Sequence, residues 1–445
     1  MAERIIIIGG DAAGMAAVSQ IRKGAPDAEI IALEKGDRTS YAACGIPFLV
    51  GGEVEGGIEQ LVARSPEQHR AKGLDLRTRH EATAIDTAAR TVEVQDLDAD
   101  ERFTLEFDQL LIGTGGTPIR PPFPGIDLPF VHGVHGLDTA AQLLAAIEDD
   151  ATQNVVVVGA GYIGLEMAEA FLHRGRTPVV VEMAPHPLTL LDPEMSGLVS
   201  DAMVERGIDL RTDTAVEGFE PGLVHTSNGS IPADLVVLGI GLGPNSQLGA
   251  EAGLELGVRD AIVVDERMQT SVDGIWAAGD CVESTHLVTG DKVHIALGTY
   301  ANKQARIAGI NIGGGDVRMP GVLGTAITKS CDTEIALTGA STAQATAAGF
   351  DVLTHSITSP TRAHYYPGVS DMTVRFVIDR PTGRLLGAQI VGGPDSAKRI
   401  DTCAVAITAG MTIDEILELD LAYAPPFSPV WDPVAVAARE ALKRR

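Results

Sequence analysis

The stretch Ile5-Ile6-Ile7-Ile8-Gly9-Gly10-Asp11-Ala12-Ala13-Gly14, near the start of this 445-residue chain, predicts a buried strand that runs into a glycine turn. Residues 15–23 then predict a helix, and the strand over residues 29–33 ends at Glu34. This order of strand, turn, helix, strand and acid is the βαβ fingerprint of a dinucleotide site. In such a site the helix N-terminus faces the pyrophosphate and the acid binds a ribose. Asp11 replaces the middle glycine of the usual pattern.

A second and complete fingerprint begins at residue 155. Four valines lead into Gly159-Ala160-Gly161-Tyr162-Ile163-Gly164, and the next strand, residues 178–181, ends at Glu182. A carboxylate at this place accepts hydrogen bonds from both ribose hydroxyls of NADH and repels the additional phosphate of NADPH, so the sequence favours NADH. Two fingerprints in one chain predict two bound dinucleotides, with electrons passing between them.

Two glycine-rich segments outside the fingerprints predict that the chain crosses between domains. Leu110-Leu111-Ile112-Gly113-Thr114-Gly115-Gly116 is a strand with a glycine turn and a proline-rich run after it, and Gly241-Leu242-Gly243-Pro244-Asn245 follows the second fingerprint. From about residue 319 alternating strands and helical stretches replace the nucleotide motifs. The sequence therefore predicts an α/β fold with two Rossmann-like dinucleotide-binding domains and a C-terminal α+β domain.

The charge and hydropathy of the chain limit its partners. The 34 Lys and Arg residues against 60 Asp and Glu give a formal net charge of −26, which argues against nucleic acid or an anionic membrane as a partner. No apolar run is long enough to span a bilayer, and the N-terminus lacks the pattern of a signal peptide, so we expect a cytoplasmic protein. An anionic substrate would need a local cluster of cations.

Cys44 is the cysteine for which the sequence predicts a redox role. It lies in Ser40-Tyr41-Ala42-Ala43-Cys44-Gly45-Ile46-Pro47, and no second cysteine follows within five residues. A reactive cysteine acts as the thiolate, which a helix N-terminus, a positive group or an electron-poor cofactor stabilises. No metal site is predicted. The other three cysteines, Cys281, Cys331 and Cys403, lack the spacing of a zinc site and are expected to be packing residues. His132 and His135 are three residues apart, but no third ligand is near them in the sequence.

These motifs, over essentially the whole chain, resemble the two-dinucleotide-fold flavoprotein disulfide reductases, in particular the single-cysteine branch with coenzyme A-disulfide reductase, NADH oxidase and NADH peroxidase. The resemblance implies FAD bound by Gly9, Gly10, Ala13, Gly14, Glu34, Lys35, Thr114, Gly115, Gly279 and Asp280. It implies NADH, with NADPH as the alternative, bound by Gly159, Gly161, Tyr162, Ile163, Gly164, Glu182 and Gly241. It also implies an FAD-binding domain (1–119 and 246–318) interrupted by an NAD(P)H-binding domain (120–245), and a dimerisation domain (319–445).

The resemblance also implies a reaction and its catalytic residues. Hydride passes from NADH to FAD and on to a mixed disulfide of Cys44 with a thiol, and the Cys44 thiolate then attacks the next small-molecule disulfide. The segments 364–368 and 423–428 are similar to those of coenzyme A-disulfide reductases, and they imply Tyr366 and Tyr423 as proton donors to the departing thiolate. Tyr423 is expected to come from the partner subunit of a homodimer. Peroxidases and oxidases of this branch typically have a histidine where this chain has Ala12.

Coenzyme A is the substrate, or the thiol in the mixed disulfide on Cys44, that the resemblance implies. Its channel is expected to lie along basic and polar residues that would supply local positive charge, namely Gln20, Lys23 and Ser40, with Arg22 and Lys72 as further candidates. Trp431 is assigned to the same substrate site, where some relatives have a lysine.

Three other hypotheses for the function stay open at this point. A persulfide or polysulfide reductase would use the same cysteine and flavin. An NADH oxidase would pass the electrons to oxygen. A flavin-bound redox sensor, in which turnover is incidental, is the alternative outside the enzymes.

Overall fold

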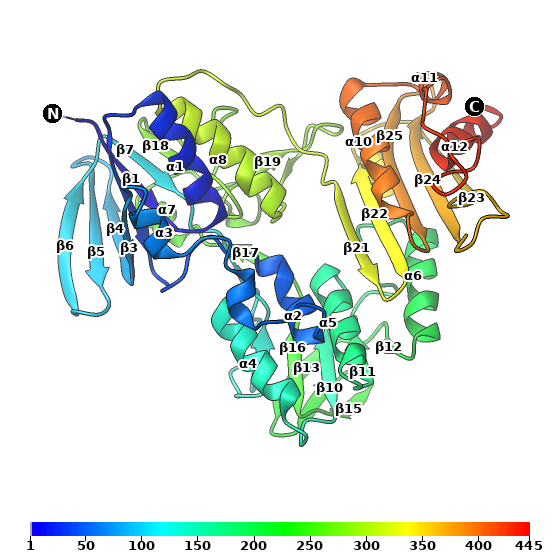
Figure 1. The fold of residues 1–445 in the computed structure, drawn as a ribbon, viewed down its shortest axis with the longest axis horizontal. Coiled ribbons are helices and arrows are strands. Elements are labelled where there is room, and N and C mark those ends of the chain that lie inside the picture. Colours follow the sequence, from blue (N-terminus) through cyan, green and yellow to red (C-terminus); the bar gives the residue numbers. More distant parts are fainter. Residues whose placement is uncertain (1) are drawn as a thin grey trace.

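The computed structural model describes residues 2–445, and its first sheet contains the first fingerprint (Figure 1). The sheet is parallel, with the strand order β18-β7-β1-β2-β3. The side chains of Ile5 to Ile8 in its middle strand are buried on both faces, as the unbroken run of isoleucines predicts for a parallel sheet. Its strands are β1 (Arg4–Ile8), β2 (Glu29–Glu34), β3 (Asp75–Thr78), β7 (Gln109–Ile112) and β18 (Ile275–Ala277). Because β18 returns to β7 after the whole second fingerprint, the chain between them is an insertion.

Helices α1 (Ala12–Gly24) and α8 (Gly298–Ile312) pack against each other beside the first sheet (Figure 1). An antiparallel three-stranded sheet lies next to it, formed by β4 (His80–Asp86), β5 (Thr91–Asp96) and β6 (Glu101–Glu106). Several short elements occur in the same stretches of the sequence: the 3-10 helices η1 (Ala43–Gly45), η2 (Ile58–Leu61) and η3 (Val258–Asp260), helices α2 (Ile46–Gly51), α3 (Pro66–Arg70) and α7 (Gln247–Glu251), and strands β19 (Ser284–Thr285) and β20 (Lys292–Val293). Of these, α2 packs against helices of the second part, α4 and α5, which are described next (Figure 1).

The second fingerprint lies in a parallel sheet of the same kind, with the order β12-β11-β10-β16-β9. Its strands are β9 (Val131–Gly133), β10 (Val155–Val158), β11 (Pro178–Val181), β12 (Asp209–Arg211) and β16 (Leu235–Leu238). The accompanying elements are helices α4 (Leu137–Glu148), α5 (Tyr162–His173) and α6 (Pro193–Glu205), and the antiparallel strands β13 (Val216–Glu220), β14 (Leu223–Thr226) and β15 (Gly229–Pro232).

The two predicted crossing segments pair with each other. Strand β8 (Gly116–Pro118) and strand β17 (Leu242–Pro244) form an antiparallel ribbon between the two parallel sheets. The Asn245 N–H donates to the Gly115 carbonyl, and the Thr114 hydroxyl donates to the Asn245 carbonyl at 2.6 Å. The outgoing and returning chains are therefore joined at one place.

The C-terminal part is an antiparallel sheet with the order β21-β22-β25-β24-β23. Its strands are β21 (Ala326–Ser330), β22 (Thr333–Gly339), β23 (Val352–Pro360), β24 (Asp371–Asp379) and β25 (Leu385–Gly392). Its helices are α9 (Thr342–Ala347), η4 (Ala397–Arg399), α10 (Ile400–Ala409), α11 (Ile413–Leu417) and α12 (Pro433–Leu442). The predicted fold class, two Rossmann-like domains followed by an α+β domain, is confirmed. No helix formed by residues 2–445 is both long and apolar enough to cross a membrane.

Candidate active site

The glycine turns of the two fingerprints have the same backbone geometry. The Gly9 N–H donates to the Leu33 carbonyl at 2.8 Å, and the Gly159 N–H donates to the Val181 carbonyl, also at 2.8 Å. Both glycines have positive φ angles, which glycine adopts without steric cost. A Cβ atom on Gly14 would lie 1.9 Å from the Gly9 carbonyl oxygen, and the equivalent distance from Gly164 is 2.0 Å. Only glycine at these places lets each helix N-terminus reach its turn.

The acid at the end of each second strand is held in the same way. Glu34 accepts hydrogen bonds from the N–H groups of Gly10 at 2.7 Å and Gly36 at 2.6 Å. Glu182 accepts them from Ala160 at 2.7 Å and Ala184 at 2.8 Å. Each carboxylate is therefore fixed beside its glycine turn, where a dinucleotide ribose is expected. The two turns fit FAD and a nicotinamide dinucleotide as ligands.

The Gly279-Asp280 motif lies at the end of β18, next to the first turn. Gly279 has a φ of +91°, and a Cβ atom on it would lie 3.1 Å from the Ala13 side chain. Burial raises the pKa of the Asp280 carboxyl, and His294 Nε2 lies 2.7 Å from the Asp280 carbonyl oxygen. Thr114 and Gly115 follow β7, which is parallel to β1 and β18, so they lie at the same end of the sheet as the first turn and the Gly279-Asp280 motif.

The remaining predicted cofactor residues differ in their surroundings. Lys35 is exposed and its ammonium pairs with Glu81 at 2.6 Å. Ile163 is partly buried at the start of α5, and Gly241 has a φ of +102° in the returning crossing. The Tyr162 hydroxyl is buried without a hydrogen-bond partner among residues 2–445, and burial followed by the nearby Glu166 raises its pKa.

Cys44 lies in η1, immediately before α2, and its side chain is exposed to solvent. Enough protein atoms surround the sulfur that desolvation raises the pKa of the thiol, and the Glu166 carboxylate raises it further. Asp280 and Asp11 act in the same direction, and the backbone N–H of Cys44 opposes them. The thiol is therefore close to residues of both fingerprints and of the Gly279-Asp280 motif.

Asp11, the residue that replaces the middle glycine, connects the first turn to the Cys44 loop. Its Oδ1 accepts a hydrogen bond from the Tyr41 N–H at 3.1 Å. Burial raises the pKa of Asp11 to about 6, and the Glu34 carboxylate contributes to this rise.

Glu166 was not predicted from the sequence as a site residue. It lies on α5 one turn after Tyr162, and it accepts a hydrogen bond from the Thr328 hydroxyl of β21 at 2.9 Å. Burial is the main reason that the pKa of Glu166 is raised. Its position four residues after Tyr162 on the same helix was the only signal in the sequence.

A cleft of about 280 Å³ lies beside the Ser40 end of the same loop. It is lined by four basic side chains and four neutral ones, namely Arg22, Arg64, His69 and Lys72, and Met15, Val18, Ser19 and Leu74. A neighbouring cleft of about 340 Å³ shares Arg22 and Lys72 with it. The Ser40 hydroxyl lies 3.0 Å from His69 Nε2. This is a local cluster of cations in an acidic protein. We call it the cation cleft.

The cation cleft contains only some of the residues predicted for the coenzyme A channel. Lys72 lines it, and Ser40 reaches it through His69. Lys23 is exposed, and its ammonium lies 3.4 Å from the Gln20 side chain on the same face of α1. Arg64 and His69 were not predicted, because nothing in their local sequence distinguishes them from an ordinary loop and helix.

The predicted tyrosines lie in the C-terminal part, away from α2 of the same chain (Figure 1). Tyr366 is in the loop between β23 and β24, and the Ala363 N–H in that loop donates to the Pro425 carbonyl at 3.2 Å, next to the Tyr423 segment. Tyr423 is 47 % exposed. Its pKa is raised by desolvation and by the phenol of Tyr365, which is the tyrosine beside it.

Several large side chains of the segments 364–368 and 423–431 are exposed. Tyr365 is 67 % exposed, and Trp431 is stacked by the Arg439 guanidinium at 5.5 Å. The structure therefore brings together Tyr365, Tyr423 and their loops, but it does not bring them to Cys44 within one chain. The exposed large side chains of these two segments are Tyr365, Tyr423, Phe427, Val430 and Trp431.

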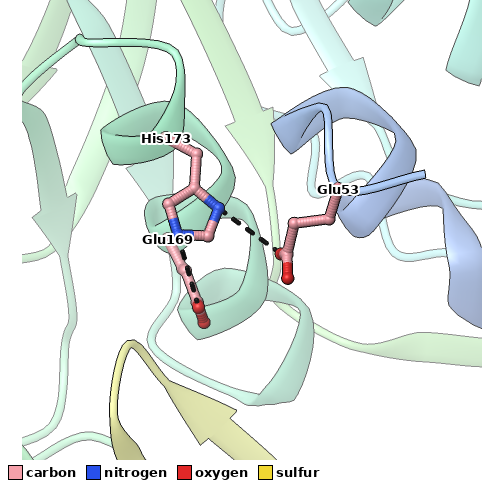
Figure 2. A group of neighbouring side chains, drawn as sticks. All are labelled: Glu53, Glu169 and His173. Carbon is pink, nitrogen blue, oxygen red and sulfur yellow. Dashed lines mark ion pairs between the residues drawn. The ribbon is translucent and has the colours of Figure 1, made fainter. Parts of the chain in front are cut away.

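A charged cluster lies where three parts of the chain meet (Figure 2). His173 Nδ1 lies 3.4 Å from Glu53, and its Nε2 lies 3.8 Å from Glu169. The Lys329 ammonium of β21 lies 2.8 Å from Glu169 and 3.5 Å from Glu53. The geometry of Glu53, Glu169 and His173 is compatible with a metal ion, but the ammonium of Lys329 already supplies positive charge to both carboxylates.

Comparison with known proteins places the chain in a family. The sequence profile described as "Pyridine nucleotide-disulphide oxidoreductase" matches residues 3–305, and that of the dimerisation domain of the same family matches residues 325–434. The chain is 38 % identical over 442 residues to the "NAD(P)H sulfur oxidoreductase (CoA-dependent)" of Pyrococcus furiosus, covering 98 % of each chain. It is 29 % identical over 428 residues to a "Coenzyme A disulfide reductase" of Staphylococcus aureus, covering 96 % of each.

A solved structure of similar sequence has the same fold. A NAD-dependent persulfide reductase from A. fulgidus superposes with a TM-score of 0.96 at 40 % identity, over 99 % of this chain and 83 % of that one. FAD and NAD(P)H are the typical cofactors of proteins with these domains, and both glycine turns described above fit them. This chain is a member of the pyridine nucleotide-disulphide oxidoreductase family and a flavin-dependent NAD(P)H:disulfide oxidoreductase.

Proposed function

We propose that the protein reduces the sulfur–sulfur bond of a coenzyme A-linked substrate, with Cys44 as the thiol that exchanges with it. The observation that carries this proposal is the cation cleft at one end of the Ser40–Cys44 loop. In a chain with a net charge of −26, a local group of cations at the Ser40 end of the loop that contains Cys44 indicates an anionic substrate. Coenzyme A has its phosphate groups at one end and its thiol at the other.

The proposed chemistry needs one cysteine only. The flavin supplies the electron pair that it receives from NAD(P)H. The Cys44 thiolate attacks one sulfur of the substrate and forms a mixed disulfide with it. The sulfur–sulfur bond of the substrate breaks, and the other sulfur leaves as a thiolate. Reduction of the mixed disulfide by the electron pair then regenerates the Cys44 thiolate. The net reaction consumes NADH, a proton and the disulfide, and it produces NAD⁺ and two thiols.

The departing thiolate needs a proton, and tyrosine phenols are suitable donors. We assign this role to Tyr423 with Tyr366, and the neighbouring phenol of Tyr365 makes Tyr365 a second candidate. Since these tyrosines are remote from Cys44 in one chain, the proposal includes a homodimer in which each partner supplies them. The exposure of Tyr365 and Tyr423 and the matched dimerisation profile support it, and the proposal assigns Trp431, which is also exposed, to the same site.

The proposal assigns the cofactors to the segments predicted from the sequence. FAD is assigned to 1–119 and 246–318, which share the first parallel sheet, and the nicotinamide dinucleotide to 120–245. The fixed Glu182 carboxylate favours NADH over NADPH, because it accepts both ribose hydroxyls and repels a 2′-phosphate.

Coenzyme A persulfide is favoured over coenzyme A disulfide as the substrate. Relatives at 38–40 % identity are named for sulfur or persulfide reduction, whereas coenzyme A-disulfide reductases are 29 % identical. With the persulfide, the same exchange releases sulfide in place of a second coenzyme A.

The test is turnover of NADH by the FAD-loaded enzyme with coenzyme A persulfide, coenzyme A disulfide and oxygen as acceptors. We expect the persulfide to give the highest kcat/KM, with one sulfide per NADH. Cys44→Ser abolishes turnover of both sulfur substrates, and the matched variant Cys331→Ser, which changes a partly buried cysteine in the turn after β21, retains it. If kcat/KM for oxygen exceeds kcat/KM for both sulfur substrates, the result would favour an NADH oxidase and contradict the proposal.

A further inference from the structure

His69 is the least exposed of the charged and polar groups that line the cation cleft. It lies on α3 with 6 % of its surface exposed, and its Nε2 lies 3.0 Å from the Ser40 hydroxyl. Arg22 comes from α1, Arg64 precedes α3, and Lys72 follows it, so the three cations approach the ring from different segments.

These surroundings disfavour a positive charge on the imidazole. Burial lowers the pKa of His69, and the positive charges of Arg64, Lys72 and Arg22 lower it further. An anion in the cleft would offset these three charges. The protonated ring would then be stabilised, and by linkage it would bind the anion more tightly than the neutral ring does.

We propose that His69 is a specificity residue that takes up a proton when a phosphate group enters the cation cleft, so that phosphate-bearing substrates bind more tightly as the pH falls. The inference rests on the proposed function, because it takes the cleft as the site for the phosphate end of the substrate. In this role His69 keeps the Ser40 hydroxyl at the cleft and adds a fourth positive charge only when the site is filled.

The first experiment measures the dissociation constant of adenosine 3′,5′-bisphosphate, the phosphate-bearing end of coenzyme A. The FAD-loaded enzyme is used with saturating NAD⁺, so that the second fingerprint is occupied. For each protein we take the ratio of the affinity at pH 5.5 to the affinity at pH 8.0. We expect this ratio to be about fivefold larger for the wild type than for His69→Gln. The titration of the ligand is common to both proteins and cancels. The control variant His225→Gln, in strand β14, keeps the wild-type pH dependence.

The second experiment needs no variant. Calorimetry of the wild type at pH 7.5, in buffers with different ionisation enthalpies, counts the protons exchanged on binding. Protonation of His69 gives net uptake, whereas cations that stabilise the phosphate dianion give release. Uptake supports the proposal, and release or no exchange overturns it.

Failure of this inference can be distinguished from failure of the proposed function. If His69→Gln keeps the pH dependence of the wild type, His69 has no such role and the cleft remains a phosphate site. If the wild type does not bind adenosine 3′,5′-bisphosphate at either pH, both the assignment of the cleft and the inference are overturned.

Discussion

The charged groups that shift the pKa of the Cys44 thiol are carboxylates, and they raise it. Glu166 is the strongest of them, and it makes the thiolate less stable. In the proposed reaction, the bound cofactor or substrate therefore supplies the stabilisation that the Cys44 thiolate needs.

Replacing Glu166 by Gln removes this charge and keeps a group that bonds to Thr328. We expect the pKa of Cys44 to fall, so that the reduced holoenzyme reacts with iodoacetamide roughly threefold faster at pH 7. The measurement is the alkylation rate against pH. Glu220→Gln, at the end of β13, is the control and should leave the rate unchanged. An unchanged or slower rate in Glu166→Gln would show that Glu166 does not act on the thiol.

At the scale of elements, the two glycine turns are the places where the backbone geometry requires glycine. Gly164→Ala places a Cβ atom 2.0 Å from the Gly159 carbonyl oxygen, so α5 must move away from its turn. We expect the dissociation constant of NADH to rise about tenfold or more while FAD remains bound. Fluorescence titration measures the dissociation constant of NADH, and the flavin absorbance measures the FAD that remains bound. Gly197→Ala on α6 has open space around its Cβ and should be neutral; an equal loss in both variants would contradict this explanation.

The parts of the structure that the sequence predicted are those with local signals. A strand, a glycine turn and an acid specify each fingerprint within about 30 residues, and both turns have the expected geometry. Glu166 with Thr328 is separated by 162 positions, and the cation cleft combines residues from α1, α3 and the loop before it. These contacts depend on how distant elements pack, so Arg64, His69 and Glu166 could not be found from their own segments.

At the scale of the whole molecule, Lys329 connects three parts of the chain. Its ammonium contacts Glu169 on α5, whose side chain is 4 % exposed, and Glu53, which follows α2. Lys329→Met leaves these carboxylates without the ammonium. We expect the free energy of unfolding to fall by about 1–2 kcal/mol in a urea titration, less than for a fully buried pair because Lys329 is partly exposed. Lys398→Met, which removes an exposed pair with Asp401, should change it little.

The junction between the second fingerprint domain and the C-terminal sheet depends on a more deeply buried pair. Arg375 of β24 is 12 % exposed, and its Nε lies 2.6 Å from Asp192, which is 4 % exposed and immediately precedes α6. Burial alone would raise the pKa of Asp192, but hydrogen bonds from Thr342 and Arg375 lower it. A depressed pKa means that the ionised carboxylate stabilises the fold above its unfolded pKa of about 3.9, and that this stabilisation is lost as the pH falls through the folded pKa.

Arg375→Met should therefore lower the free energy of unfolding by about 3–5 kcal/mol at pH 7, because the Asp192 carboxylate stays buried without its positively charged partner. The loss should shrink toward pH 4, where Asp192 of the variant becomes protonated and no longer leaves a buried charge. Urea unfolding of the holoenzyme at the two pH values measures both quantities. Arg380→Met, which removes an exposed pair with Asp351, should cost less than 1 kcal/mol at either pH. A loss for Arg375→Met that is independent of pH would mean that packing of the guanidinium, and not its charge, stabilises the junction.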